Sequence, residues 1–271
     1  MAAKQNAQGD LLTLAAIAIV VYAIANILHE GVGHAGACLI VGGRPRVLSS
    51  TYFDCDTAGL AGWAGRIVAA GGTLVNLAAA AVGFGALRRA RAASPQLRYY
   101  AWLFVTVNLL QGTGYFLFSG VANIGDWAFV VAGWRPPWVW RIALAALGAA
   151  SYWFSVRIAL VQLGPFIGGD APGRYRRATR LALVPYLTGA TLYCLAGLVN
   201  PMGMGLVAVS AAAASLGGTS GLAWGPQLLR GEGIPHAGDG PTVISRHWGW
   251  IVAGGVVALS FVGVLGPGVQ L

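Results

Sequence analysis

The segment HEGVGH, residues 29–34, places two histidines and a glutamate at the end of a long apolar run, residues 11–28. We interpret this segment as an HExxH motif, in which two imidazoles on one face of a helix bind a zinc ion. His29 and His34 are then metal ligands, and Glu30 is the general base that takes a proton from a metal-bound water. Ionisable side chains are costly inside a membrane and are by default functional there. The alternative is that each of the three side chains serves helix packing or a polar pocket independently of the others.

A catalytic zinc ion usually has three protein ligands, so one more residue must reach the depth of the two histidines. The segment after the third apolar run lies on the same side of the membrane as HEGVGH, and Asp126 is its only acid. We predict that Asp126 is the third ligand of one zinc ion per chain. Its alternative role is the N-cap of a short helix. Asp54 and Asp56 lie on the same side of the membrane and are rival ligands.

The composition indicates a membrane protein. Hydrophobic residues make up 57% of the chain and charged residues only 9%, whereas a soluble domain has about 25% charged residues. The apolar runs are continuous, without the two-residue alternation of a β-barrel, so the spans are expected to be helices. We assign the net charge of +9 to basic loops and expect no nucleic-acid partner. Cys38, Cys55 and Cys194 show no CxxC spacing, and we expect neither a disulfide framework nor a thiolate zinc site.

We expect an all-α polytopic membrane protein with about six to seven transmembrane helices, forming a single membrane domain over residues 1–271. The candidate spans are residues 11–41, 61–87, 99–119, 138–163, 181–199, 203–224 and 248–266. Residues 11–130 would form the catalytic core, and residues 138–271 would add C-terminal spans. The apolar part between the third and fourth spans is too short to cross the bilayer, so a short re-entrant or loop segment is expected near residues 120–135.

The loop arginines indicate an orientation in the membrane. Residues 88–98 and 174–180 each contain four arginines, and two spans separate them, so both lie on one side of the membrane. The positive-inside rule makes that side cytoplasmic. HEGVGH would then lie towards the opposite side.

Three features resemble the site-2 protease family of intramembrane zinc metalloproteases, in its compact branch without a PDZ domain. HEGVGH stands at the end of an early span. AAGGTLVNLAAA, residues 69–80, is similar to the family's G-P-x-x-N helix, with Asn76 at the asparagine and Thr73 where proline is common. VNLLQGTGYFLFSGVANIGDW, residues 107–127, is similar to the segment that leads to the family's ligand aspartate, although I-G-D-W replaces the usual L-D-G.

The resemblance implies a multi-pass protein of a bacterial-type plasma membrane whose zinc ion is held by His29, His34 and Asp126. With Glu30 as general base, it would hydrolyse a peptide bond in a membrane-embedded or membrane-proximal protein substrate. Asn76 would bind the substrate backbone or the oxyanion, its alternative role being to join helices.

The family's hairpin after the motif helix corresponds to residues 42–54, which would either pair with an extended substrate or form a plain loop. The resemblance also implies an active site that faces the cytoplasm, opposite to the orientation indicated by the arginines. Two other functions remain open. One is a metal-dependent hydrolase of a small or lipid-like substrate, and the other is a transporter that uses the His/Glu cluster as an ion relay.

Overall fold

The computed structural model describes residues 9–271 except 90–91, 169–170, 204, 206–210 and 231–240. Within this part of the chain, six helices are long and apolar enough to cross a membrane, which confirms the expectation of an all-α polytopic membrane protein. In chain order they are α2 (Leu11–Ile27) continued by the π-helix η1 (Leu28–Ala35) and α3 (Gly36–Ile40), α4 (Trp63–Arg89), α5 (Pro95–Ala122), α7 (Pro137–Ile167), α8 (Ala171–Leu198), and α11 (Trp248–Ser260) continued by the π-helix η6 (Phe261–Leu265).

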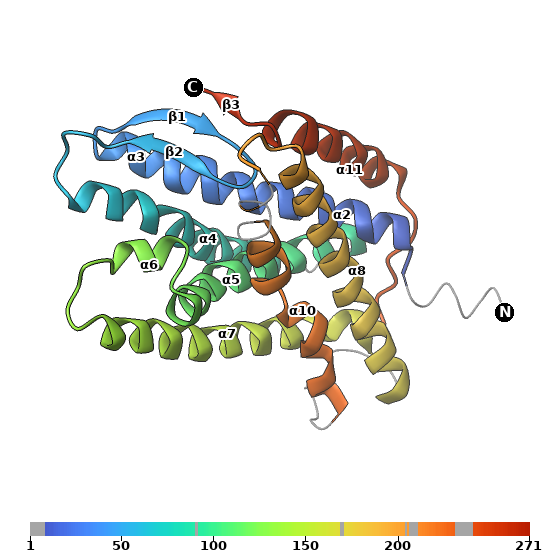
Figure 1. Cartoon of the computed structure of the whole chain (residues 1–271). Helices are drawn as coiled ribbons and strands as arrows, with labels where there is room; N and C mark the ends of the chain where they lie inside the picture. Colours follow the sequence, from blue (N-terminus) through green and yellow to red (C-terminus); the bar gives the residue numbers. More distant parts are fainter. Residues whose placement is uncertain (1–8, 90–91, 169–170, 204, 206–210, 231–240) are drawn as a thin grey trace.

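The first span lies at the centre of the bundle (Figure 1). α5, α8 and α11 pack against α2, and Leu14, Ile17 and Val21 are fully buried. Membrane helices approach closely where small residues face each other. Gly254 of α11 lies directly against Ala16 of α2, where a side chain would collide with the Ala16 backbone. Polar groups carried by the first span are therefore surrounded by protein and shielded from lipid.

A small antiparallel sheet covers the end of the first span. β1 (Arg44–Leu48) pairs with β2 (Phe53–Asp56) on one side and with β3 (Val269–Gln270) on the other. The strand order is β2-β1-β3, so β2 is an edge strand. Residues 42–54 therefore form part of a hairpin and not a plain loop, and pairing of the hairpin with a substrate stays a prediction.

A disulfide bond ties this hairpin to the first span. It joins Cys38 of α3 to Cys55 of β2, whose Cα atoms are 6.0 Å apart, while Cys194 of α8 is a free thiol. The expectation that the cysteines form no disulfide was therefore wrong. A disulfide requires two Cα atoms to meet in space, which the hairpin brings about without CxxC spacing.

The residues between the third and fourth spans form the expected short segment near residues 120–135. α6 (Asp126–Val130) is a short helix, and turns connect it to α5 and α7. It packs against α4, where the ring of Phe129 lies over Gly65. Figure 1 shows α6 at the same end of the bundle as the hairpin, with the start of α2 at the other end.

The sixth expected span, residues 203–224, is not one continuous helix in its described part, and the rest of it lies outside the described residues. It contains the π-helix η4 (Ala213–Gly217) and α10 (Gly221–Trp224), followed by the 3-10 helix η5 (Gly225–Arg230). The chain still changes ends between α8 and α11. Asn200 donates to the carbonyl of Gly266 near the hairpin, whereas Ser245 accepts from Gln96 at the other end. Six continuous spans and one interrupted crossing thus agree with the expected six to seven.

Candidate metal centre

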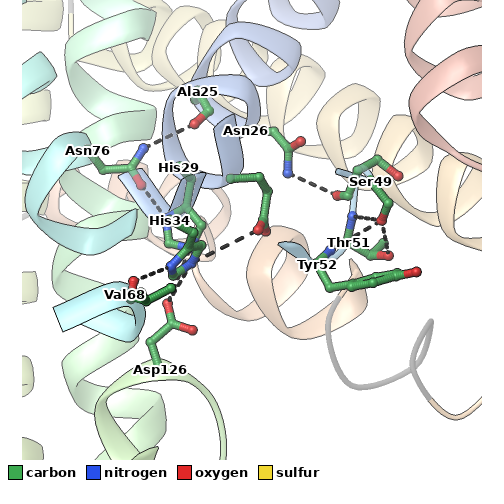
Figure 2. Close-up of polar contacts among 12 residues, drawn as sticks. Ala25, Asn26, His29, His34, Ser49, Thr51, Tyr52, Val68, Asn76 and Asp126 are labelled. Atoms are coloured by element: carbon green, nitrogen blue, oxygen red, sulfur yellow. Dashed lines mark hydrogen bonds and ion pairs between the residues drawn. The ribbon is translucent and has the colours of Figure 1, made fainter. Parts of the chain in front are cut away.

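Three side chains from two distant segments meet in the structure (Figure 2). His29 and His34 come from η1, and Asp126 is the first residue of α6. The Nε2 atoms of His29 and His34 lie 3.3 and 3.5 Å from Oδ2 of Asp126. One ligand atom from each residue lies within 4.8 Å of the other two, and the described part of the chain holds no second group of this kind. The three residues predicted as ligands are close enough to share a metal ion.

The two histidines are five residues apart, one more than in HExxH, so the interpretation of the segment as HExxH was wrong in its spacing. Five residues make about 1.4 turns of an α-helix, which would direct the two side chains to different faces. Residues Leu28–Ala35 form instead a π-helix, whose backbone hydrogen bonds join residues five apart. This wider turn brings His29 and His34 together, with ring centroids 4.7 Å apart.

Hydrogen bonds at Nδ1 fix the orientation of both imidazoles. Nδ1 of His29 lies 2.6 Å from Oδ1 of Asn76, and Nδ1 of His34 lies 2.7 Å from the carbonyl oxygen of Val68. Both oxygens are acceptors, so each Nδ1 carries a proton and each neutral ring presents a lone pair at Nε2. Nε2 of His29 and Oδ2 of Asp126 are buried without a hydrogen-bond partner. With both rings neutral, two Nε2 lone pairs face the Asp126 carboxylate, an arrangement that a cation would balance.

Asn76 lies behind His29, inside the bundle. Its Nδ2 donates to the carbonyl oxygen of Ala25 at 3.2 Å and to Oδ1 of Asn108 at 2.8 Å, which leaves its Oδ1 to accept from His29. Nδ2 of Asn108 donates in turn to the carbonyl oxygen of Phe104. Asn76 thus joins α4 to the first span and to α5, which is its alternative role, and a contact with substrate stays a prediction.

Glycines allow α4 to approach the two imidazoles. A Cβ atom on Gly72 would lie 2.6 Å from Nε2 of both His29 and His34. Gly33 of η1 packs so closely against Gly71 and Gly72 that a side chain there would collide with the backbone of α4. We refer to His29, His34 and Asp126 together as the ligand cluster. The side of this cluster that faces α4 has room only for glycine.

A cavity of about 740 Å³ opens beside the cluster. Glu30, His34 and Asp126 line it, and Oε2 of Glu30 lies 4.0 Å from Nε2 of His34. The rest of the wall comes mainly from the hairpin, α4, α5, α6 and η4, with Tyr152 of α7. Glu30, predicted as the general base, thus faces the same space as two of the predicted ligands.

The rival acids do not join the cluster. Asp56 accepts a hydrogen bond from the backbone N–H of Ala58 at 2.9 Å and pairs with Arg46, and these two contacts hold the pKa of its carboxyl below the ordinary value. Asp54 is exposed and lines the cavity apart from the cluster. The N-cap of α6 is the residue before Asp126, so the structure does not show the alternative role of Asp126 as a helix cap.

Sequence reasoning missed two residues that support the cluster. The ring of Tyr115 stacks on the imidazole of His29, with centroids 4.7 Å apart and 17° between the planes. Arg66 of α4 donates to the carbonyl oxygens of Val130 and Ala132 at 2.6 and 2.7 Å, and so ties the end of α6 to α4. An arginine near the start of an apolar helix is a signal that could have indicated a partner. The position of Tyr115 in the sequence gives no indication that it contacts His29.

Comparisons of this chain with protein-family models, with curated proteins and with solved structures find no match. The resemblance to site-2 proteases therefore stays a prediction. Function has to be inferred from the site itself.

Proposed function

We propose that this protein is an intramembrane zinc metalloprotease, which hydrolyses a peptide bond in or near a transmembrane segment of a partner protein. The observation that carries the proposal is the meeting of His29, His34 and Asp126 beside Glu30 at the edge of a cavity. Two histidines and a carboxylate form a ligand set that catalytic zinc sites use, with the fourth position left for water or substrate.

The distances from Asp126 to the two histidines fit a zinc ion. Ligand atoms about 2.0–2.1 Å from a tetrahedral zinc ion lie about 3.3 Å from one another. Oδ2 of Asp126 lies 3.3 Å from Nε2 of His29 and 3.5 Å from Nε2 of His34. These distances are too long for good hydrogen bonds, and Oδ2 of Asp126 and Nε2 of His29 have no other partner. The donor set and its spacing both support zinc binding.

Different residues of the chain would have different roles in hydrolysis. A bound zinc ion would supply Lewis-acid chemistry, polarising the scissile carbonyl and lowering the pKa of the attacking water. The Glu30 carboxylate accepts a proton from that water and returns it to the leaving amine. Asn76 and the Val68 carbonyl hold the Nδ1 protons of the two imidazoles, which keeps both Nε2 lone pairs directed at the cluster.

The hairpin supports a polypeptide substrate over a small or lipid-like one. β2 is the edge strand of its sheet, and residues 53–55 of this strand line the cavity. An extended peptide can pair with such an edge through its backbone, since an edge strand presents unpaired N–H and C=O groups. Pairing of this kind would hold a peptide bond beside the cluster, whereas a small or lipid-like molecule would make no use of a strand edge.

Zinc content tests the metal site. The purified protein should contain about one zinc ion per chain, measured by mass spectrometry of the elements. His34→Ala and Asp126→Ala should lose it, whereas Asp54→Asn should retain it because Asp54 lines the same cavity outside the cluster. Full zinc retention by Asp126→Ala would contradict the proposed ligand set.

Cleavage tests the reaction. Reporter proteins with one apolar span are reconstituted with the purified protein in lipid vesicles, and their fragments are identified by mass spectrometry. Glu30→Gln should keep the zinc ion and lose cleavage, because only the proton acceptor is removed. Ion flux across the vesicles without cleavage by the unsubstituted protein would instead support the transporter.

A further inference from the structure

The disulfide bond and the ligand cluster lie at the same end of the helix bundle. Cys38 follows His34 by four residues on the first span, and Cys55 lies in β2, beside the cavity. α6, which carries Asp126, is at this end as well (Figure 1). Disulfides persist in oxidising compartments and are rare in the cytosol. A disulfide at this position indicates that this end of the bundle faces an oxidising space.

The disulfide is built into the hairpin's packing. A Cβ atom on Gly43, the residue before β1, would lie 2.7 Å from Sγ of Cys55 and 2.9 Å from Sγ of Cys38. The glycine thus leaves room for the sulfur atoms beneath the strand. The bond holds β2, and with it one wall of the cavity, against the first span.

The loop charges indicate the same orientation. At the end that carries the cluster, the connections 41–62, 123–136 and 266–271 hold three arginines and three aspartates, so their formal charges cancel. At the opposite end, the connections 88–98 and 168–180 hold eight arginines and one aspartate. Short loops with an excess of arginine and lysine stay in the cytoplasm. The covalent and the electrostatic observations are independent of each other and agree.

We propose that the ligand cluster and the hairpin face the oxidising, non-cytoplasmic side of the membrane, and that the protein's substrate is a membrane protein cut on that side. The statement about the substrate rests on the proposed function, whereas the orientation does not. This orientation is opposite to the one that the resemblance to site-2 proteases implies. The substrate class is then the segments of partner proteins that emerge on the non-cytoplasmic side of the membrane.

Reporter cysteines test the orientation directly. Ala61 is exposed in the connection after the hairpin, and Ala92 is exposed in the arginine-rich connection 88–98. Each is changed to cysteine in the full chain with Cys194→Ala, which leaves the native disulfide in place. Intact cells are treated with a membrane-impermeant maleimide. The Ala61→Cys protein should be labelled at once, and the Ala92→Cys protein only after the membrane is permeabilised. The reverse pattern would overturn the proposal.

A thiol count on the unsubstituted protein gives a second measurement that needs no variant. Cells are lysed in denaturant with excess N-ethylmaleimide. The mass of the intact protein is measured before reduction, and again after reduction followed by a second treatment with N-ethylmaleimide. We expect one modified cysteine before reduction, Cys194, and three after it. Three modified cysteines before reduction would overturn the disulfide and its implication of an oxidising face. Neither measurement depends on zinc or cleavage. A cluster that binds zinc but faces the cytoplasm would contradict only the proposed orientation. A cluster that faces the non-cytoplasmic side but binds no zinc would contradict only the proposed function.

Discussion

Nδ1 of His29 lies 2.6 Å from Oδ1 of Asn76, and this contact connects the ligand cluster to the interior of the bundle. The amide of Asn76 is oriented by Asn108, and the amide of Asn108 is oriented by the backbone of Phe104. Hydrogen bonds across three spans therefore determine which nitrogen of His29 faces Asp126. Such outer partners are needed because an imidazole can bind a metal only with the nitrogen that carries a lone pair.

Asn76→Ala should weaken zinc binding about 10- to 100-fold, the usual cost of losing an outer partner of a ligand. His29 would lose the acceptor that holds its Nδ1 proton, and Oδ1 of Asn108 would lose its donor. The affinity is measured by competition with a chelator. Asn200→Ala is the control, since it removes another buried amide that contacts neither histidine. Equal zinc affinities in the two variants would mean that Asn76 does not position His29.

Gly72→Ala should abolish stoichiometric zinc binding. The new methyl group would lie 2.6 Å from Nε2 of both histidines, closer than atoms can approach without displacement. Gly36→Ala is the matched control, because it adds the same methyl group to a helical glycine with nothing within 4 Å. Zinc content after gel filtration compares the two. A Gly72→Ala protein that keeps its full zinc content would contradict the position of α4 against the cluster.

Arg66→Ala should reduce the affinity for zinc about tenfold, equivalent to about 1.4 kcal/mol. Arg66 holds the end of α6 through Val130 and Ala132, so its loss would let Asp126 move away from the histidines. The effect should be smaller than that of Asp126→Ala, which removes a proposed ligand. Arg46→Ala deletes an exposed arginine of the hairpin and should leave the affinity unchanged. If both arginine variants bind zinc as well as the unsubstituted protein, α6 does not depend on this anchor.

The double change Cys38→Ser with Cys55→Ser should lower the thermal unfolding midpoint in detergent. The bond closes a loop between residues 17 apart in the sequence, and closing a loop of about this length is worth roughly 3 kcal/mol. Scanning fluorimetry with and without a reductant measures the change. Cys194→Ser should unfold at the same temperature as the unsubstituted protein, and reductant should have no effect on the double variant. A midpoint that is insensitive to both the substitutions and the reductant would mean that the hairpin is held by its other contacts.

The spans could be predicted from the sequence because a bilayer demands long apolar runs, and these are visible without a structure. The meeting of Asp126 with the two histidines followed from counting crossings, since each span reverses the direction of the chain. The disulfide could not be predicted because Cys38 and Cys55 approach only after the hairpin folds back. The same holds for the stacking of Tyr115 on His29, which depends on how α5 is rotated about its axis.

The backbone form of the motif was the other feature that the sequence did not disclose. Regular α-helical geometry predicts that residues five apart diverge, and only the structure shows that Leu28–Ala35 widens into a π-helix. Gly33 in this segment also has no side chain to collide with Gly71 and Gly72, so the wider turn can lie directly against α4. Helix periodicity alone contains neither fact.

The widened turn has a consequence for how such sites are found. A signature that fixes two residues between the glutamate and the second histidine passes over this chain, although its imidazoles meet. A search pattern that allows three residues between the glutamate and the second histidine would find it. Such a pattern would also require an asparagine on the second apolar helix and an aspartate after the third, and it would find other chains with the same spacing. In those chains, one additional residue would change the spacing of the histidines in the sequence, while a π-helix would still bring their side chains together.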